Sequence, residues 1–361
     1  MEIFVMDEAF RSLYNLDTFE SMIWTERYNG CGNFEFYTPV NQSILQVVNT
    51  IQKKMEAKLD CYAWLKESGT TMIIEDLEIT TDTETGNHLI VSGRGLESLL
   101  ERRIVWEQTV LNGNLQNGVQ RLINDAVINP KIEDRKIPKF LFSASTNEYI
   151  ISLVLRAQYT GDNLYDVLLT ICDTYQLGFD VNLDMNDNFV FSLKYGEDRS
   201  YDQNKNPYVI FSPRYENIIN SDYLESAKTL KNVTLVAGED SGNARRTRVV
   251  GSASGLARRE LYTDARDIQS EVDGVKLTDA QYNALLDQRG SEKLAEHVYT
   301  KVFTGEIEAS KTFVYDKDFF IGDIVQITNE YNMESRVRVS EIVRVQDTTG
   351  YSMYPTFQVI E

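Results

Sequence analysis

The first third of the chain alternates apolar and polar residues in short runs. Runs such as IFVMD (3–7) and GNFEFYTP (32–39) are rich in aromatic and β-branched residues, which is typical of half-buried strands. A polar turn separates the apolar runs 71–82 and 87–93, and this order predicts a long antiparallel hairpin. The strands expected in this part of the chain are 3–7, 18–28, 32–39, 56–66, 71–82 and 87–93.

The segment from 108 to 195 has a different period, because its apolar residues recur at helical spacing in two places. The first set is Leu115, Val119, Leu122, Ile123, Ala126 and Val127. The second set is Leu164, Val167, Leu168, Ile171, Cys172 and Tyr175, preceded by the capping residues Asp162 and Asn163. After Gly178, alternation around the turn MNDN predicts a hairpin, so we expect an α+β unit between mostly β flanks.

Strands return after residue 208, and a helix interrupts them. The expected strands are 208–213, 215–229, 231–238 and three alternating runs in the last fifty residues. The capping box formed by Thr278 and Gln281 predicts the start of the helix. Its expected inward-facing residues are Leu285, Leu286, Leu294, Val298 and Val302. Gly290 and Ser291 are expected to bend or break it.

The composition is that of a folded, multi-domain protein. The 361 residues are 42% hydrophobic and 25% charged, with a formal net charge of -19 and a pI near 4.6. Such an acidic surface repels the phosphate backbone, which argues against a protein whose function is to grip DNA. No apolar run approaches the roughly 18 residues of a membrane span, and the acidic start MEIFVMDEAF does not resemble a signal peptide.

Positive charge is concentrated in residues 244–267, ARRTRVVGSASGLARRELYTDARD. Its six arginines are Arg245, Arg246, Arg248, Arg258, Arg259 and Arg266. Guanidinium groups form strong pairs with carboxylates, which an acidic protein has in excess. The partners lie either on neighbouring subunits or within the stretch, which supplies Glu260, Asp264 and Asp267. A subunit interface and a solvated hairpin with charged, protected edges are therefore both open interpretations.

Candidate catalytic and metal-binding residues are few. Neither His88 nor His297 belongs to a ligand pattern, and the three cysteines are too widely spaced for a zinc site. The tract GSASG has Ala253 at the position where a nucleophile elbow has serine. We therefore predict no catalytic residue, no cofactor and no metal site.

Several blocks of the sequence, taken in order, resemble one family. They are YNGCGNFEFYTP (28–39), SGRGLESLLERRIVW (92–106), YVIFSPRYENIINSDY (208–223), KNVTLVAGE (231–239), SGLARRELYTDARD (254–267), FFIGDIVQIT (319–328) and the final YPTFQVIE. Together they are similar to the Gp-thirty-seven-like tail proteins of siphophages. That family is itself similar to the baseplate hub and to the amino-terminal domain of tail-associated lysins.

The resemblance implies a mainly β protein with an α+β insert, arranged as four domains. Two are tail-tube-like β-barrel domains, one is the inserted α+β domain, and one is a small C-terminal β domain. The implied ranges are 1–107 with 196–235 for the first barrel, 108–195 for the insert, 236–310 for the second tube-like β domain with its helix, and 311–361 for the C-terminal domain.

The resemblance also implies a structural protein of the virion tail tip, a baseplate hub and not an enzyme. Three copies are expected to form a ring that continues the sixfold tail tube and adapts it to threefold tip components. A distal tail protein or tail-tube ring is the expected partner above it, and fibre, spike or lysin components are expected below. The six arginines of residues 244–267 are then expected at subunit contacts.

Genomic DNA is expected to pass through the ring without specific binding, because an acidic lumen does not hold phosphates. Two other classes stay open at this point. One is a tail-tip cell-wall hydrolase, and the other is an adhesin that binds host glycans.

Overall fold

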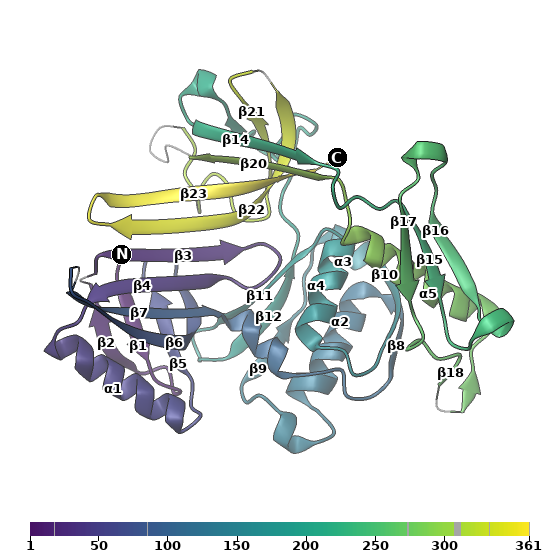
Figure 1. Ribbon diagram of the computed structural model, residues 1–361, viewed down its shortest axis with the longest axis horizontal. Coiled ribbons are helices and arrows are strands. Elements are labelled where there is room, and N and C mark those ends of the chain that lie inside the picture. The colour runs from purple at the N-terminus through teal and green to yellow at the C-terminus, as the bar shows by residue number, and fades with distance from the viewer. Residues whose placement is uncertain (18, 85, 273, 307–311, 332, 361) are drawn as a thin grey trace.

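The protein is mostly β, and a computed structural model describes residues 1–17, 19–84, 86–272, 274–306, 312–331 and 333–360. Figure 1 shows a large sheet that extends over two halves, a helical insert beside it, and a small sheet with one helix at the opposite end of the molecule. The described strands form several sheets, of which the largest has 13 strands.

The first half of the large sheet contains the amino-terminal strands. They are β1 (Ile3–Met6), β2 (Ser12–Leu16), β3 (Ser21–Arg27), β4 (Asn33–Pro39), β5 (Cys61–Leu65), β6 (Thr70–Asp82) and β7 (Gly86–Gly95). Their order is β3-β4-β7-β6-β5-β1-β2, with antiparallel neighbours. The hairpin predicted from 71–82 and 87–93 is confirmed as β6 and β7.

A helix that the sequence analysis did not predict, α1 (Gln42–Glu56), covers this half of the sheet. The Asn41 side chain accepts a hydrogen bond from the Ile44 amide and caps the helix. The helix residues that pack against the sheet are Ile44, Val47, Val48 and Ile51. The strand expected over 56–66 is correspondingly shorter and is confined to β5.

The insert has the α+β character that its mixed periodicity predicts. Its elements are β8 (Thr109–Asn114), α2 (Leu115–Ile123), β9 (Phe140–Ser143), α3 (Glu148–Ser152), β10 (Val154–Tyr159), α4 (Leu164–Thr174), β11 (Gly178–Leu183) and β12 (Phe189–Lys194). Asn163 caps α4 as expected, because its side chain accepts a hydrogen bond from the Tyr165 amide. The predicted hairpin is β11 with β12, and β9 adds to it in parallel.

The second half of the large sheet comes from later in the chain. Its strands are β13 (Ile210–Phe211), β14 (Ile219–Ser226), β20 (Thr300–Glu306), β21 (Ile324–Thr328), β22 (Glu334–Asp347) and β23 (Gly350–Val359). The antiparallel pair β22 and β3 joins the two halves. Next to this ladder Arg344 is buried, and its Nη1 lies 2.5 Å from Glu26 Oε1.

The four predicted domain ranges stay a prediction, and the strand pairing adds one observation about them. The strands of 311–361 pair with β20 and β3 as well as with one another. β13 and β14 pair with β21 and β20. An alternating pattern identifies a strand but not its partners, so these pairings were not predictable from the sequence.

The small sheet at the other end has the order β16-β15-β17, and a helix packs on one of its faces. Its strands are β15 (Val233–Ala237), β16 (Thr247–Gly251) and β17 (Glu260–Asp264), and the helix is α5 (Asp279–Ala295). A two-stranded ribbon of β18 (Glu271–Val272) and β19 (Val275–Lys276) precedes the helix.

The helix α5 confirms one expectation and corrects two. Thr278 and Gln281 form the predicted capping box. The break expected as one possibility at Gly290 and Ser291 does not occur, because α5 continues to Ala295. A Cβ at Gly290 would lie 2.6 Å from Val250 Cγ2, so this glycine allows close packing of helix on sheet.

The inward-facing positions predicted near the end of α5 are also wrong in part. Leu285 and Leu286 are buried, but Val298 lies beyond the helix and is exposed, and Val302 belongs to β20. The apolar spacing continues past the end of the helix into the next strand, and this misleads a period-based prediction.

Candidate functional site: the arginine-rich sheet

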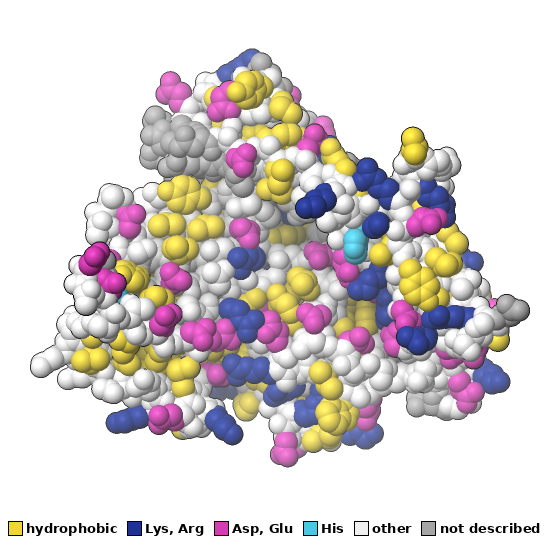
Figure 2. Space-filling view, viewed as in Figure 1, with side chains coloured by type: hydrophobic (Ala, Val, Ile, Leu, Met, Phe, Trp, Pro, Cys, Tyr) yellow, Lys and Arg dark blue, Asp and Glu magenta, His cyan; other side chains and the backbone are white. Residues whose placement is uncertain are grey.

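The six arginines singled out in the sequence lie on and around the β16-β15-β17 sheet. Figure 2 shows Lys and Arg side chains, with carboxylates between them, over the part of the molecule that β15–β17 and α5 occupy in Figure 1. The structure therefore brings residues that are up to 21 positions apart in the sequence onto one small sheet.

Two of the arginines attach α5 to the sheet. Arg248 donates two hydrogen bonds to Asp287 of the helix, at 2.7 and 2.8 Å. This pairing raises the pKa of Arg248 above its ordinary value. The Arg246 guanidinium carbon lies 3.8 Å from the centre of the Tyr282 ring, and the group also pairs with Glu239 at 3.3 Å. Arg246 and Arg248 therefore stabilise the packing of α5 on the sheet of the same chain.

The other four arginines lie toward the exposed face and the strand ends. Arg245 donates to Asp264 at 3.1 Å and to the Tyr262 hydroxyl at 2.9 Å. Arg266 also pairs with Asp264, and its hydrogen bonds hold the pKa of that carboxyl below its ordinary value. Arg258 pairs with Glu260 at 2.5 Å.

Arg259 contacts the backbone, because its guanidinium donates to the Ala227 carbonyl. The stretch thus supplies its own partners, as the sequence suggested for Glu260 and Asp264. Asp267 differs, because it pairs with Arg289 of α5 at 2.8 Å. These contacts exist within one chain, and a contact between the arginines and a neighbouring subunit stays a prediction.

The sequence analysis missed an apolar row between these charges. Val249, Leu235 and Tyr262 are partners in the strand register, and all three are exposed. They lie on the face of the sheet away from α5. The sequence could have indicated this row. The face of a sheet opposite the buried face normally carries polar residues, and these three positions carry large apolar or aromatic side chains instead.

Residues that might have indicated chemistry have structural partners instead. The buried His88 ring stacks on Tyr37 with 4.6 Å between centroids, and its Nε2 lies 3.3 Å from Glu20. The His297 ring contacts the Lys293 carbonyl. Within the described ranges, no three His, Cys, Asp or Glu side chains are grouped so that they could hold a metal ion. No described helix is long and apolar enough to cross a membrane.

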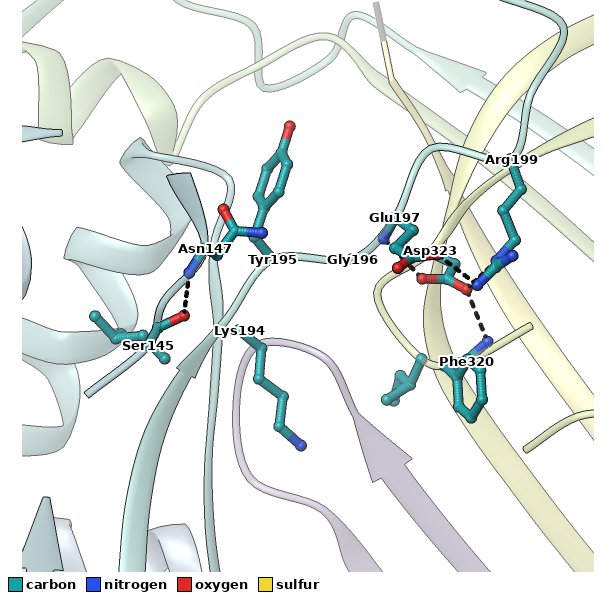
Figure 3. A pocket seen from close by; sticks show the side chains of 11 residues that line it. Ser145, Asn147, Lys194, Tyr195, Gly196, Glu197, Arg199, Phe320 and Asp323 are labelled. Carbon is teal, nitrogen blue, oxygen red and sulfur yellow. Dashed lines mark hydrogen bonds and ion pairs between the residues drawn. The ribbon is translucent and has the colours of Figure 1, made fainter. Parts of the chain in front are cut away.

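A cleft of about 350 Å³ lies where the insert meets the second half of the large sheet. Figure 3 shows Ser145 and Asn147 on one side of it and Glu197, Arg199 and Asp323 on the other. Arg199 pairs with Asp323 and with Glu197, at 2.7 Å in each case. The charged groups that line the cleft are therefore largely engaged with one another, and Lys194 also lines it.

Comparison with known proteins gives one family match and a set of related folds. The sequence pattern of the family described as Siphovirus ReqiPepy6 Gp37-like protein matches residues 1–357. No curated protein matches the sequence.

Three solved structures of tail proteins share the fold over nearly their whole length. A tail protein from Neisseria meningitidis MC58 is 13% identical, with a TM-score of 0.55, and the match covers 99% of this chain and 96% of that one. The 43 kDa tail protein of prophage MuSo2 from Shewanella oneidensis is 12% identical, with a TM-score of 0.55 and coverage of 100% and 98%.

The prophage tail protein gp18 from Listeria monocytogenes EGD-e is 12% identical, with a TM-score of 0.52 and coverage of 99% and 94%. At such low identity the likeness concerns the fold, whereas the family match concerns the sequence itself. The chain belongs to the Siphovirus ReqiPepy6 Gp37-like family.

Proposed function

We propose that this chain is a structural protein of the phage tail tip, a baseplate hub subunit. One observation carries the proposal: the fold matches three tail proteins, two of them from prophages, over 99 to 100% of this chain. A match of that extent includes the sheet, the insert and the arginine-rich sheet together. The proposed role is therefore one of assembly geometry and not of catalysis.

In the proposed assembly, three copies form a closed ring around the tail axis. Each chain contributes two tube-like β units, so that three chains continue a sixfold tube and end it with threefold symmetry. The ranges predicted for these units, 1–107 with 196–235 and 236–310, stay a prediction, and the pairing of β3 with β22 joins amino-terminal and carboxy-terminal strands in one sheet. Its end strands β2 and β14 each have one neighbour, so each has an edge on which another chain can pair.

The ring would join a distal tail protein or tail-tube ring above it and fibre, spike or lysin components below. The net charge of -19 supports passage of DNA through the lumen, because a phosphate that is not neutralised is not held. A channel lined with guanidinium groups would instead bind the phosphates and hold the DNA. The pairing of the arginines with carboxylates of the same chain agrees with this proposal.

Cryo-electron microscopy of intact virions tests the proposal directly. We expect three copies of the chain in one closed ring at the tail tip, with the tube lumen continuing through it. Six copies, one copy, or a location outside the tail tip would contradict the hub assignment. Assays for peptidoglycan turnover and for glycan binding on the purified chain test the hydrolase and adhesin alternatives.

A further inference from the structure

The exposed face of the β16-β15-β17 sheet has an apolar centre. Val249, Leu235 and Tyr262 form a row across the three strands, with 57%, 43% and 56% of their surfaces exposed. A contiguous exposed apolar patch on a folded protein usually marks a contact surface. The opposite face of the same sheet is already covered by α5.

Charged residues border this apolar row on both sides. Asp264 with Arg245 and Arg266 lies on one side, and Glu260 with Arg258 lies on the other. An apolar centre containing tyrosine, surrounded by arginines, is the usual composition of a protein–protein interface. We call this surface, made of the row and its bordering charges, the outer face.

The charge of the outer face favours an acidic partner. The outer face holds Arg245, Arg258 and Arg266 against Glu260 and Asp264, which is a positive excess in a chain of net charge -19. The β6–β7 hairpin is an acidic segment, because residues 71–93 contain five acids and neither lysine nor arginine. Ile79 is exposed there on one face of the hairpin, Glu78 is exposed on the opposite face, and Glu84 is exposed in the turn that joins the two strands.

The two surfaces lie far apart on the molecule. In Figure 1, β6 and β7 lie in the left half and β15–β17 at the right-hand side, along the long axis. One chain therefore does not bring them together, whereas a head-to-tail contact between copies does. Contacts of this kind form a closed ring when the rotation between copies closes.

We propose that the outer face binds the acidic β6–β7 hairpin of a second copy of this chain. Leu235 and its neighbours bury Ile79, and the bordering arginines meet Glu84 in the turn of the hairpin. The inference rests on the proposed ring and names the surfaces that form it.

Sedimentation of the purified chain tests the apolar row. We expect the parent to self-associate into trimers and Leu235→Glu to weaken association by at least about tenfold, because it places a carboxylate in a desolvated contact. Leu141→Glu is the matched control, since Leu141 is 45% exposed and also belongs to a three-stranded sheet. Circular dichroism shows whether both variants keep the parent fold.

A charge exchange tests the partner. Arg266→Glu alone and Glu84→Arg alone should each weaken association, and the two together should restore it. Weakening by Leu235→Glu without restoration by the exchange would overturn the hairpin as the partner. Monomeric parent protein at every concentration, or unchanged trimers with Leu235→Glu, would overturn the inference.

These outcomes are distinct from failure of the hub assignment. A trimeric ring at the tail tip that forms despite Leu235→Glu rejects the outer face and leaves the hub role intact. Absence of the chain from the tail tip rejects the hub role whatever the variants do in solution.

Discussion

Arginine suits the small sheet better than lysine because several guanidinium groups there make more than one hydrogen bond. Arg245 reaches two backbone carbonyls, the Tyr262 hydroxyl and Asp264 at once. Arg248 uses its planar fork for a two-point contact with Asp287. The sequence indicated that these residues would pair with acids, but it did not show that each would find partners within the chain.

A buried carboxyl at Glu97 makes the stability of the protein dependent on pH. Glu97 lies in the first turn of the short 3-10 helix Leu96–Arg102 and accepts a hydrogen bond from the Val181 amide of the insert. Burial raises the pKa of Glu97 to about 7, against the smaller opposing effect of that hydrogen bond. Between its ordinary pKa and this raised pKa, Glu97 is therefore protonated in the folded protein and ionised in the unfolded chain.

We predict that Glu97→Gln removes this dependence. For an acid with a raised pKa in the folded state, stability falls as pH rises from the unfolded pKa to the folded one. Relative to the parent, the free energy of unfolding of the variant should increase by up to roughly 3 kcal/mol between pH 4.5 and pH 8. Urea unfolding at several pH values measures it, and a difference that is constant with pH would contradict the prediction.

At the scale of elements, most strands and the main helices follow from periodicity and capping. The exception is α1, although Ile44, Val47, Val48 and Ile51 have helical spacing behind the cap Asn41. All four side chains are β-branched valines or isoleucines next to predicted strands, which favoured a β interpretation. Tertiary packing on the sheet decides the outcome there.

The pairing of strands is the part of the fold that the sequence could not provide. β3 lies beside β22, more than 300 residues later in the chain, and no local pattern encodes such a neighbour. The candidate site shows the same limit. The arginines were identified one by one, but the row of Val249, Leu235 and Tyr262 appears only when three strands are set in register.

The contact between α5 and the small sheet gives a prediction for Gly290. Changing Gly290 to alanine gains helix propensity of about 1 kcal/mol, but the new Cβ would meet Val250 and Val236 side chains at 2.6 and 2.8 Å. Overpacking typically costs 1 to 3 kcal/mol, so we expect Gly290→Ala to be less stable than the parent by about 1 kcal/mol.

Urea unfolding of Gly290→Ala measures this loss, with Ser291→Ala as the control. Ser291 is exposed and adjacent on the same helix, so its change should alter stability by no more than about 0.5 kcal/mol. Equal or greater stability of Gly290→Ala would show that the helix is not tightly packed at this point.

At the scale of the whole molecule, charge is distributed unevenly. The arginine-rich sheet lies at one end of the long axis, and the acidic β6–β7 hairpin lies in the other half. Such a separation favours head-to-tail association and disfavours contacts between equivalent surfaces, because like charges would then meet. The arginines could serve either of two functions, contact with another protein chain or binding of DNA, and the two functions respond differently to charge reversal.

Reversal of Arg258 and Arg259 to glutamate distinguishes these functions. We expect the parent not to retain duplex DNA at low salt, since a chain of net charge -19 repels phosphates and its arginines already have partners. The double reversal should keep the fold and weaken self-association by roughly tenfold or more, because it adds acids to a surface that meets an acidic partner. Circular dichroism, sedimentation and DNA retention are compared with the parent.

A matched reversal of the exposed Arg121 and Lys131 in the insert should change none of the three. DNA retention by the parent with a steep salt dependence, lost in the Arg258 and Arg259 variant while association is unchanged, would show instead that this surface binds nucleic acid.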